Sequence, residues 1–377
     1  MQHLVTIVKV SRKCNLRCAY CLDRNSKGNS RMSFEVLANT IAWALRSARR
    51  QTVSFIWHGG EPTLLPRSFY QKALLLQAEF ARDDQRISNQ IQTNATRITH
   101  EWASFLIQFD FSVGVSLDGP ASVHDAYRIG SKANSTFQNV LNGIEILRKY
   151  DVQICVLAVV TDKALELGAE RFLDFFLENG INNLALNAVM PSIHRSPDSM
   201  GLRYYLEPED RNKFYCSLYD EWLKRGIDKI RIREFDAIHN VLIAKQSSLC
   251  VFTGNCHGHY FEVNVDGTIT HCDSEGRNEA SLGNVLTDAL DDIISSARLS
   301  KLHEKAELER NAMRRCTEFG VCKGWCPQQR LISKTYYSGH DDACCGLAPF
   351  ILHVRRRLDS HPDLMARYTS ASKLSAS

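Results

Sequence analysis

The sequence predicts an α/β fold, a partial (β/α)6 TIM-like barrel, followed by a C-terminal cysteine-rich domain. Over residues 1–190, short apolar runs alternate with segments of helical periodicity, which is the pattern of successive βα units and a parallel sheet. Eight cysteines then fall between Cys250 and Cys345. Without a secretory signal, such a density indicates metal ligands rather than disulfides.

Six strands are expected in the first domain, each followed by a helix or a loop. They are residues 4–10, 53–57, 87–92, 111–117, 152–160 and 184–187. Because the carboxyl ends of parallel strands meet at one rim of a barrel, the loops after these strands should gather there. We therefore expect the active site at that rim.

The rest of the chain is expected to form three further parts. Residues 191–249 read as a bridging segment, because prolines interrupt it before two helical stretches at 212–226 and 235–245. Residues 250–347 form the cysteine-rich domain, in which Asp266-Gly267 between two apolar runs predicts a β-hairpin. Residues 348–377 are a helix and a tail.

Composition excludes several classes of protein. The 377 residues are 44% hydrophobic and 23% charged, as in a soluble globular protein. A formal charge of +4 is mild, so neither a nucleic acid nor a membrane is expected as a partner. No signal peptide is recognised and no apolar stretch approaches about 18 residues, so the cytoplasm is the expected compartment.

Three cysteines stand on the loop after the first expected strand. Cys14, Cys18 and Cys21 have the spacing C-x-x-x-C-x-x-C. Three thiolates can hold a 4Fe–4S cluster and leave its fourth iron open to a ligand that is not protein. The alternative is a zinc site, which would need a fourth Cys or His nearby, and none follows before His58.

Polar residues follow the next three expected strands. They are Glu61 after the glycine pair Gly59-Gly60, then Gln92 and Asn94, then Ser116, Asp118 and Arg128. Paired glycines allow close approach of the backbone to a ligand, a glutamate can accept from an ammonium group, and an arginine can pair with a carboxylate. Plain turns are the alternative, and Asp118 before Gly119-Pro120 also fits an Asx-turn. Together the groups fit a ligand with an ammonium, a carboxylate and a ribose.

These motifs resemble those of the radical S-adenosylmethionine superfamily. The likeness rests on the three cysteines, on Tyr20 before the last of them, and on the turn 59–62. It implies that the open iron binds S-adenosylmethionine and that its cleavage yields a radical that abstracts a substrate hydrogen. It also implies cofactor-binding roles for Tyr20, Gly59, Gly60, Glu61, Gln92, Asn94, Ser116, Asp118 and Arg128.

The C-terminal cysteines resemble a SPASM domain, which implies two auxiliary 4Fe–4S clusters and so three clusters in all. By this likeness Cys250, Cys256, Cys272 and Cys326 hold the first auxiliary cluster, and Cys316, Cys322 and Cys344 hold part of the second. Met313 stands where the pattern has a further cysteine. Three outcomes are open: Cys345 replaces it, one iron stays open, or the second cluster is missing. A zinc ribbon is the alternative for the whole region.

Asp273 is the candidate catalytic residue. It follows Cys272, and its likeness to an aspartate of sulfatase-maturing enzymes implies a base that accepts a proton during the reaction. A turn acid is the alternative. His257 and His259 beside Cys256 are either donors to cluster sulfur or exposed. Cys155 and Cys216 are expected to be buried filler.

The resemblance implies an enzyme that modifies a ribosomally made peptide. The segments Trp57-His58 and 116–128, with His124-Asp125, look closest to maturases that form crosslinks, and a cyclophane between an aromatic ring and a β-carbon is the expected product. The alternatives are an anaerobic sulfatase-maturing enzyme that forms formylglycine, a thioether- or ether-forming maturase, and a non-catalytic metal-stapled binding protein.

Three partners are expected. They are a precursor peptide, a reductant protein such as flavodoxin or ferredoxin, and a separate leader-recognition protein. The third is expected because the chain begins at the first strand, which leaves leader recognition to another protein or to the bridging and SPASM surfaces.

Overall fold

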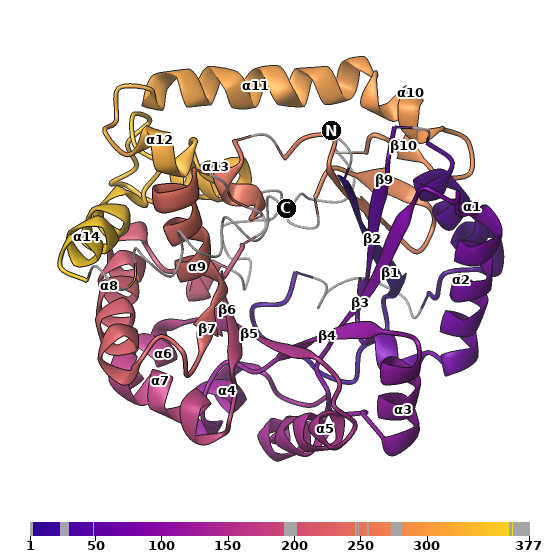
Figure 1. The fold of residues 1–377 in the computed structure, drawn as a ribbon, viewed down its shortest axis with the longest axis horizontal. Coiled ribbons are helices and arrows are strands. Elements are labelled where there is room, and N and C mark those ends of the chain that lie inside the picture. The colour runs from indigo at the N-terminus through magenta and orange to yellow at the C-terminus, as the bar shows by residue number, and fades with distance from the viewer. Residues whose placement is uncertain are drawn as a thin grey trace. The chain divides into compact units, whose positions relative to one another are not determined.

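A computed structural model of the chain describes residues 3–22, 30–47, 49–191, 202–245, 247, 249–254, 256–272, 281–361 and 364. The chain, coloured by residue number in Figure 1, divides into two compact units. The first consists of Met1–Leu117, His124–Leu157 and His257–His303. The second consists of Asp118–Val123, Ala158–Cys256 and Glu304–Ser377. Each unit therefore combines segments that are far apart in the sequence.

The first unit is built on parallel strands that follow chain order. They are β1 (His3–Ser11), β2 (Thr52–Gly59), β3 (Arg86–Thr93), β4 (Phe111–Ser116) and β5 (Ile154–Val160), which continues into the second unit. Each pairs in parallel with the next. These strands lie where the sequence predicts them, and their order confirms the expected βα units. Strand β1 is buried along eight of its nine residues, as expected for a strand covered on both faces.

A second group of strands extends this sheet at β1. Strand β8 (Tyr260–Val263) pairs in parallel with β1, and β9 (Thr268–Thr270) and β10 (Gly283–Asn284) follow in antiparallel order. The predicted hairpin at Asp266-Gly267 is confirmed, with Gly267 in the left-handed region at φ +84°. Its place in the barrel sheet was not predicted. A buried ion pair crosses the join, because Lys9 Nζ lies 3.4 Å from Glu262 Oε2.

Helices cover the outer side of strands β1 to β4 (Figure 1). In the first unit the helical elements are α1 (Phe34–Leu45), η1 (Pro62–Leu64), α2 (Arg67–Phe80), α3 (His100–Gln108), α5 (Phe137–Lys149) and α10 (Leu290–Ile294). Tyr70 of α2 is fully buried and packs edge-on against Trp57 and Trp102, with ring centroids 5.8 and 5.6 Å away. Its hydroxyl donates to Pro62 O at 3.0 Å, which fixes η1 on the core.

The second unit continues the strand order and adds a helical layer. Strand β6 (Asn183–Ala188) follows β5, and β7 (Arg231–Ile232) follows β6. The helical elements are α6 (Asp162–Leu167), α7 (Ala169–Glu178), η2 (Leu202–Tyr204), α8 (Pro208–Arg225), α9 (Arg233–His239), the π-helix η3 (Asn240–Ala244), η4 (Cys250–Phe252), α12 (Phe319–Cys322), α13 (Pro327–Tyr336) and α14 (Ala348–Asp359). Two helices begin in one unit and end in the other: α4 (Ala121–Tyr127) and α11 (Ala297–Met313).

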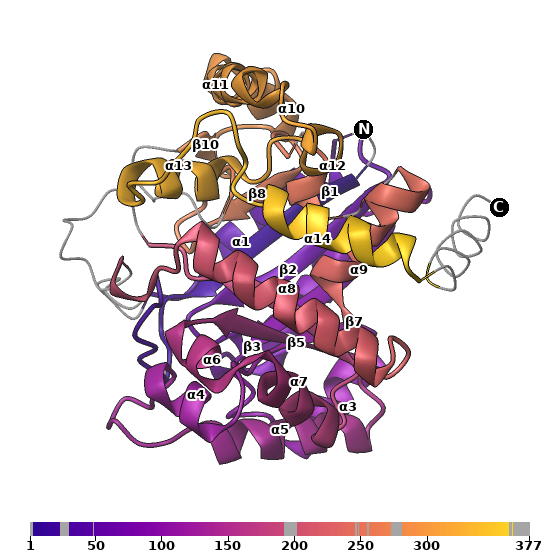
Figure 2. The same ribbon diagram turned by 90° about the vertical axis from the view of Figure 1, so that its left-hand side faces the viewer.

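Aromatic side chains form the core of the second unit. Helices α8 and α14 lie side by side (Figures 1 and 2), and Tyr219 of α8 packs near Trp222, Phe235 and Phe350. The Tyr219 hydroxyl lies 2.7 Å from His239 Nε2. The two helices expected in the bridging segment are thus confirmed, the second as α9 followed by a π-turn. None of the helices in the described part of the chain has the length and hydropathy of a membrane span.

We predict that Asp125 stabilises the start of α5. Its carboxylate accepts from the backbone N–H groups of Thr136 and Phe137 at 2.9 and 3.1 Å, and from the Ser135 hydroxyl at 2.6 Å. Asp125→Ala should lower the free energy of unfolding by about 1–2 kcal/mol, the usual cost of losing a helix cap. Denaturant unfolding measures this, with Glu79→Ala on exposed α2 surface as the control. Equal losses in the two variants would contradict the capping role.

Candidate functional site

The cysteine loop is held by backbone hydrogen bonds to residues 127–131. Arg17 N donates to Ile129 O and Ala19 N to Tyr127 O, both at 2.8 Å. An isolated bridge joins Leu16 to Gly130. Cys14 and Cys21 are exposed on this loop and Cys18 is buried. The loop is therefore a fixed platform that carries one buried and two exposed cysteines.

The glycine pair packs directly against the beginning of this loop. Gly60 N donates to Ser11 O at 2.7 Å, and Glu61 N donates to Lys13 O at 2.9 Å. A Cβ atom on Gly60 would lie 2.2 Å from Lys13 O. Gly59, at φ +125°, would place a Cβ atom 2.4 Å from Ser11 O. The close approach that the sequence predicts is thus observed, toward the cysteine loop itself.

Glu61 is buried and its carboxylate is bound to protein groups. One oxygen accepts from Thr63 N at 2.9 Å and from the hydroxyls of Thr63 and Thr93 at 2.6 Å. The other accepts from Asn94 N at 2.8 Å. Glu61 therefore caps η1 and ties the glycine turn to the end of β3. Its contact with a ligand ammonium stays a prediction.

Polar residues at the ends of β3 and β4 make hydrogen bonds to neighbouring segments. Gln92 Nε2 donates to Ser116 Oγ at 3.0 Å. Gly114 between them has no side chain, and a Cβ atom there would lie 2.0 Å from Gln92 Oε1. Asn94 Nδ2 donates to Asn15 Oδ1 at 3.0 Å and lies 3.9 Å from Cys14 Sγ. The first unit thus brings Asn94 to the cysteine loop, and Gln92 joins the end of β3 to the end of β4.

Arg128 is buried beside Tyr20. Its Nη1 donates to the Tyr20 hydroxyl at 2.7 Å, and its guanidinium carbon lies 5.9 Å from the centre of that ring. A buried cation next to the cysteine loop favours an anionic ligand there. Asp118, predicted to bind ribose, belongs to the second unit, where its Oδ1 accepts from Val159 N at 3.0 Å.

The surroundings of Cys14 favour the protonated form of its thiol when no metal is bound. Desolvation by surrounding protein raises the pKa of its thiol to about 12, the Leu16 N–H opposes this, and the nearby Glu61, Cys18 and Cys21 raise it further. Cys14 therefore keeps its proton at neutral pH unless a metal ion displaces it. Three thiols on one loop, with an amide directed at one sulfur, are the donor set of a cubane with an open iron.

Lys9 is a residue near this site that sequence reasoning missed. It is buried in β1, and its Nζ lies 3.3 Å from His58 Nδ1 as well as near Glu262. The available signal was a lysine inside an otherwise apolar strand, since buried lysines are rare without a partner. The hydroxyl of Thr93 and the amide of Asn15 were also missed, because their partners come from distant segments.

Three residues that suggested a crosslinking maturase have structural roles. Trp57 lies in the core, and its Nε1 donates to Asn89 Oδ1 at 2.9 Å. His124 is fully buried, and burial lowers its pKa to about 3. Asp125 caps α5, as described above. Their contacts explain these residues without reference to a substrate.

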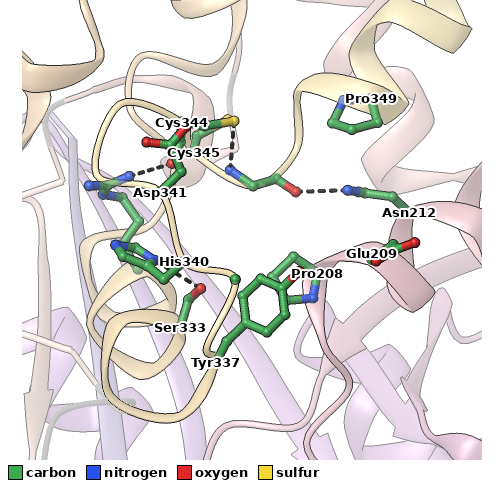
Figure 3. A pocket seen from close by; sticks show the side chains of 13 residues that line it. Pro208, Glu209, Asn212, Ser333, Tyr337, His340, Asp341, Cys344, Cys345 and Pro349 are labelled. Atoms are coloured by element: carbon green, nitrogen blue, oxygen red, sulfur yellow. Dashed lines mark hydrogen bonds between the residues drawn. The ribbon is translucent and has the colours of Figure 1, made fainter.

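The second unit gathers four C-terminal cysteines. The Cys345 thiol is hydrogen-bonded to those of Cys322 and Cys344. The charges of Cys316 and Cys344 act to raise the pKa of the Cys322 thiol. Cys344 and Cys345 also line a cavity of about 270 Å³ with Asn212, Tyr337 and His340 among its walls (Figure 3).

In the second unit, an aromatic contact lies close in sequence to both Cys250 and Cys326. Phe252 in the turn begun by Cys250 packs edge-on against Trp325, with ring centroids 5.1 Å apart, and Trp325 directly precedes Cys326. Cys256 ends this segment of the second unit, whereas Cys272 belongs to the first.

The remaining candidates have varied positions. His257 and His271 stack in the first unit with ring centroids 4.2 Å apart, and His259 Nδ1 lies 3.2 Å from His3 O. Asp273 lies outside the described residues. Cys155 on β5 and Cys216 on α8 are half-buried, each with part of its surface in solvent. They are therefore less buried than the sequence predicts.

Comparison with known proteins places this site in a family. Residues 8–176 match the Radical SAM superfamily, and residues 250–323 match SPASM, an iron–sulfur cluster-binding domain. The serine-type anaerobic sulfatase-maturating enzyme of Bacteroides thetaiotaomicron is 31% identical, over 94% of this chain and 90% of that protein. The chain belongs to the family of anaerobic sulfatase-maturating enzymes. The cysteine-type enzyme of Clostridium perfringens is 30% identical, over 88% and 90%.

Solved structures agree with this family. Native anSMEcpe with bound AdoMet and Cp18Cys peptide has a TM-score of 0.84 and 27% identity, over 98% of this chain and 99% of that one. Streptococcus suis SuiB bound to precursor peptide SuiA shares the fold, with a TM-score of 0.63 and 17% identity. The predicted fold class and radical enzyme are confirmed, and the family's cofactors are 4Fe–4S clusters and S-adenosylmethionine. These relatives favour the sulfatase-maturing alternative over cyclophane formation.

We predict that Gly60→Ala removes the cluster from the cysteine loop. Because the added Cβ would meet Lys13 O, the turn or the loop must shift and the three sulfurs lose their arrangement. Anaerobically reconstituted protein should lose about four irons per chain, one cubane, and should no longer bind S-adenosylmethionine. Iron and sulfide analysis measures the first effect and equilibrium binding the second.

Gly320→Ala is the matched control, because a Cβ atom there meets nothing within 4 Å. It should keep the iron content and the cofactor affinity of the unmodified chain. Full iron content in Gly60→Ala would show that the close contact does not hold the loop.

Proposed function

We propose that this enzyme oxidises a cysteine or serine side chain of a sulfatase to formylglycine. The observation that carries the proposal is similarity along nearly the whole chain to serine-type and cysteine-type sulfatase-maturating enzymes. Structural neighbours include complexes with peptides, which supports a polypeptide substrate. A reductant protein such as flavodoxin or ferredoxin, and a separate recognition protein, remain further proposals.

The first unit supplies the binding site for the cofactors in this proposal. Cys14, Cys18 and Cys21 hold the first cluster, and the glycine turn, Gln92, Asn94, Ser116 and Arg128 surround the S-adenosylmethionine bound to it. When bound, the cluster and S-adenosylmethionine would supply a radical that abstracts a substrate hydrogen, and an acceptor for the electron that remains. The fixed backbone of the cysteine loop and the buried Tyr20–Arg128 pair support this arrangement, because both are held by protein contacts alone.

The cysteine-rich region supplies the auxiliary clusters. Cys250, Cys256, Cys272 and Cys326 hold the first of them, and Cys316, Cys322 and Cys344 contribute to the second. Asp273, next in the chain to Cys272, is the proposed base, and its carboxylate would take the proton released when the substrate side chain is oxidised.

A peptide assay tests this function. The anaerobic holoenzyme is incubated with S-adenosylmethionine, a reductant and a sulfatase-derived peptide that carries cysteine, serine or alanine at the target position. The cysteine peptide should lose about 18 mass units and the serine peptide about 2, while the alanine peptide stays unchanged. Both products should react with a hydrazide, because each contains an aldehyde.

Hydrazide reactivity separates this proposal from crosslinking. A loss of about 2 mass units without an aldehyde would indicate a new bond between side chains and would contradict the proposal. Asp273→Asn should cleave S-adenosylmethionine but form little aldehyde. Undiminished aldehyde in that variant would remove Asp273 from the mechanism.

A further inference from the structure

The second auxiliary cluster lacks an obvious fourth ligand. A 4Fe–4S cluster is held by four cysteine thiolates, and Cys316, Cys322 and Cys344 provide three. The match to the iron–sulfur cluster-binding domain ends at residue 323, so it does not identify a cluster ligand after that residue. Besides Cys322, two further sulfur-containing residues of the second unit are buried, Met313 and Cys345.

Cys345 lies inside the thiol group. Its thiol is hydrogen-bonded to the thiols of Cys322 and Cys344. Cys322 in turn lies near enough to Cys316 and Cys344 for their charges to affect the pKa of its thiol. The four thiols therefore form one connected set within a single unit.

Backbone amides point at three of these sulfurs. Gly324 N donates to Cys322 Sγ at 3.4 Å, Gly346 N to Cys344 Sγ at 3.4 Å, and Leu347 N to Cys345 Sγ at 3.3 Å. In each case the donor is two residues after the cysteine. Successive amides, as at Gly346 and Leu347, can form the anion-binding concavities that are common around Fe–S sites, and hydrogen bonds to sulfur tune the cluster potential.

The same local geometry occurs at the first cluster site. Leu16 N donates to Cys14 Sγ at 3.4 Å, again from two residues further along the chain. Cys345 thus has the backbone setting of a cysteine that the superfamily motif assigns as a ligand. Its own cysteine neighbour, Cys344, has that setting as well.

The turn that carries Cys344 and Cys345 is held from both sides (Figure 3). Asn212 Nδ2 donates to Gly346 O at 2.8 Å, and Arg330 Nη1 donates to Cys344 O at 2.8 Å. Gly346 adopts φ +75°, a conformation that side chains with a Cβ atom rarely take. The two sulfurs are therefore presented by a rigid turn, as a cluster ligand requires.

Met313 lies where its side chain fills the core, and its contacts do not require it to be a ligand. It is the last residue of α11 and is 1% exposed. A Cβ atom on Gly324 would lie 3.0 Å from the Met313 methyl group, so this side chain covers the Cys322–Gly324 turn. A thioether is a weak acceptor and fills irregular apolar space well.

We propose that Cys345, together with Cys316, Cys322 and Cys344, completes the ligand set of the second auxiliary cluster, and that Met313 packs beside it without binding iron. The inference rests on the cluster content proposed above and is independent of the substrate.

Iron content of variants tests the proposal without any substrate. Anaerobically reconstituted Cys345→Ala should hold about four irons and four sulfides fewer per chain than the unmodified protein, the content of one cubane. Met313→Leu should keep the full content. Cys216→Ala, a half-buried cysteine of α8, is the matched control and should also keep it.

A second variant provides the rescue. Cys345→Ala combined with Met313→Cys places a thiol at the end of α11, where Met313 packs against the Cys322–Gly324 turn, and should regain the lost cubane, seen by iron analysis and Mössbauer spectroscopy. Full iron in Cys345→Ala, loss of a cluster in Met313→Leu, or failure of the double variant to regain iron would each overturn the proposal. So would an unmodified chain with only about eight irons. Peptide oxidation is not measured, so failure of the proposed function leaves these results unaffected.

Discussion

The site depends on one backbone contact, between the glycine turn after β2 and the first residues of the cysteine loop after β1. Two amide–carbonyl hydrogen bonds form it, from Gly60 to Ser11 and from Glu61 to Lys13. They are possible only because residues 59 and 60 have no side chain. The buried Glu61 carboxylate then extends the contact to β3 through Thr93 and Asn94. Loops from three neighbouring strands thus become one rigid frame for the three thiols, before any cofactor contributes.

Backbone groups also position the cysteines of the second unit. Cys322 and Cys344 stand in tight turns, in which the amide two residues further along the chain donates to each sulfur. Asn212 and Arg330 fix the second turn from outside. In both units, therefore, backbone groups orient the sulfurs and reduce the conformational freedom that cluster assembly must remove.

The strands and the cysteine loop could be predicted because their signals are local. The apolar run of β1 and the spacing of Cys14, Cys18 and Cys21 are visible within about one strand and one loop. The pairing of β8 with β1 could not be predicted, because a strand of four residues carries no information about a partner 255 residues away in the chain. For the same reason the ion pair of Lys9 with Glu262, and the partners of Glu61, were invisible. The choice between cyclophane and formylglycine chemistry also lay beyond the sequence, since Trp57 and His124 proved to be core residues.

The central claim is that Cys14, Cys18 and Cys21 hold the cluster that binds and cleaves S-adenosylmethionine. Its most direct test is the formation of 5′-deoxyadenosine under reducing conditions by the variant in which all three are alanine, with its iron content measured in parallel. The account predicts no 5′-deoxyadenosine and a loss of about four irons per chain, while the iron of the C-terminal cysteines remains. Continued cleavage of S-adenosylmethionine, or an unchanged iron content, would contradict it.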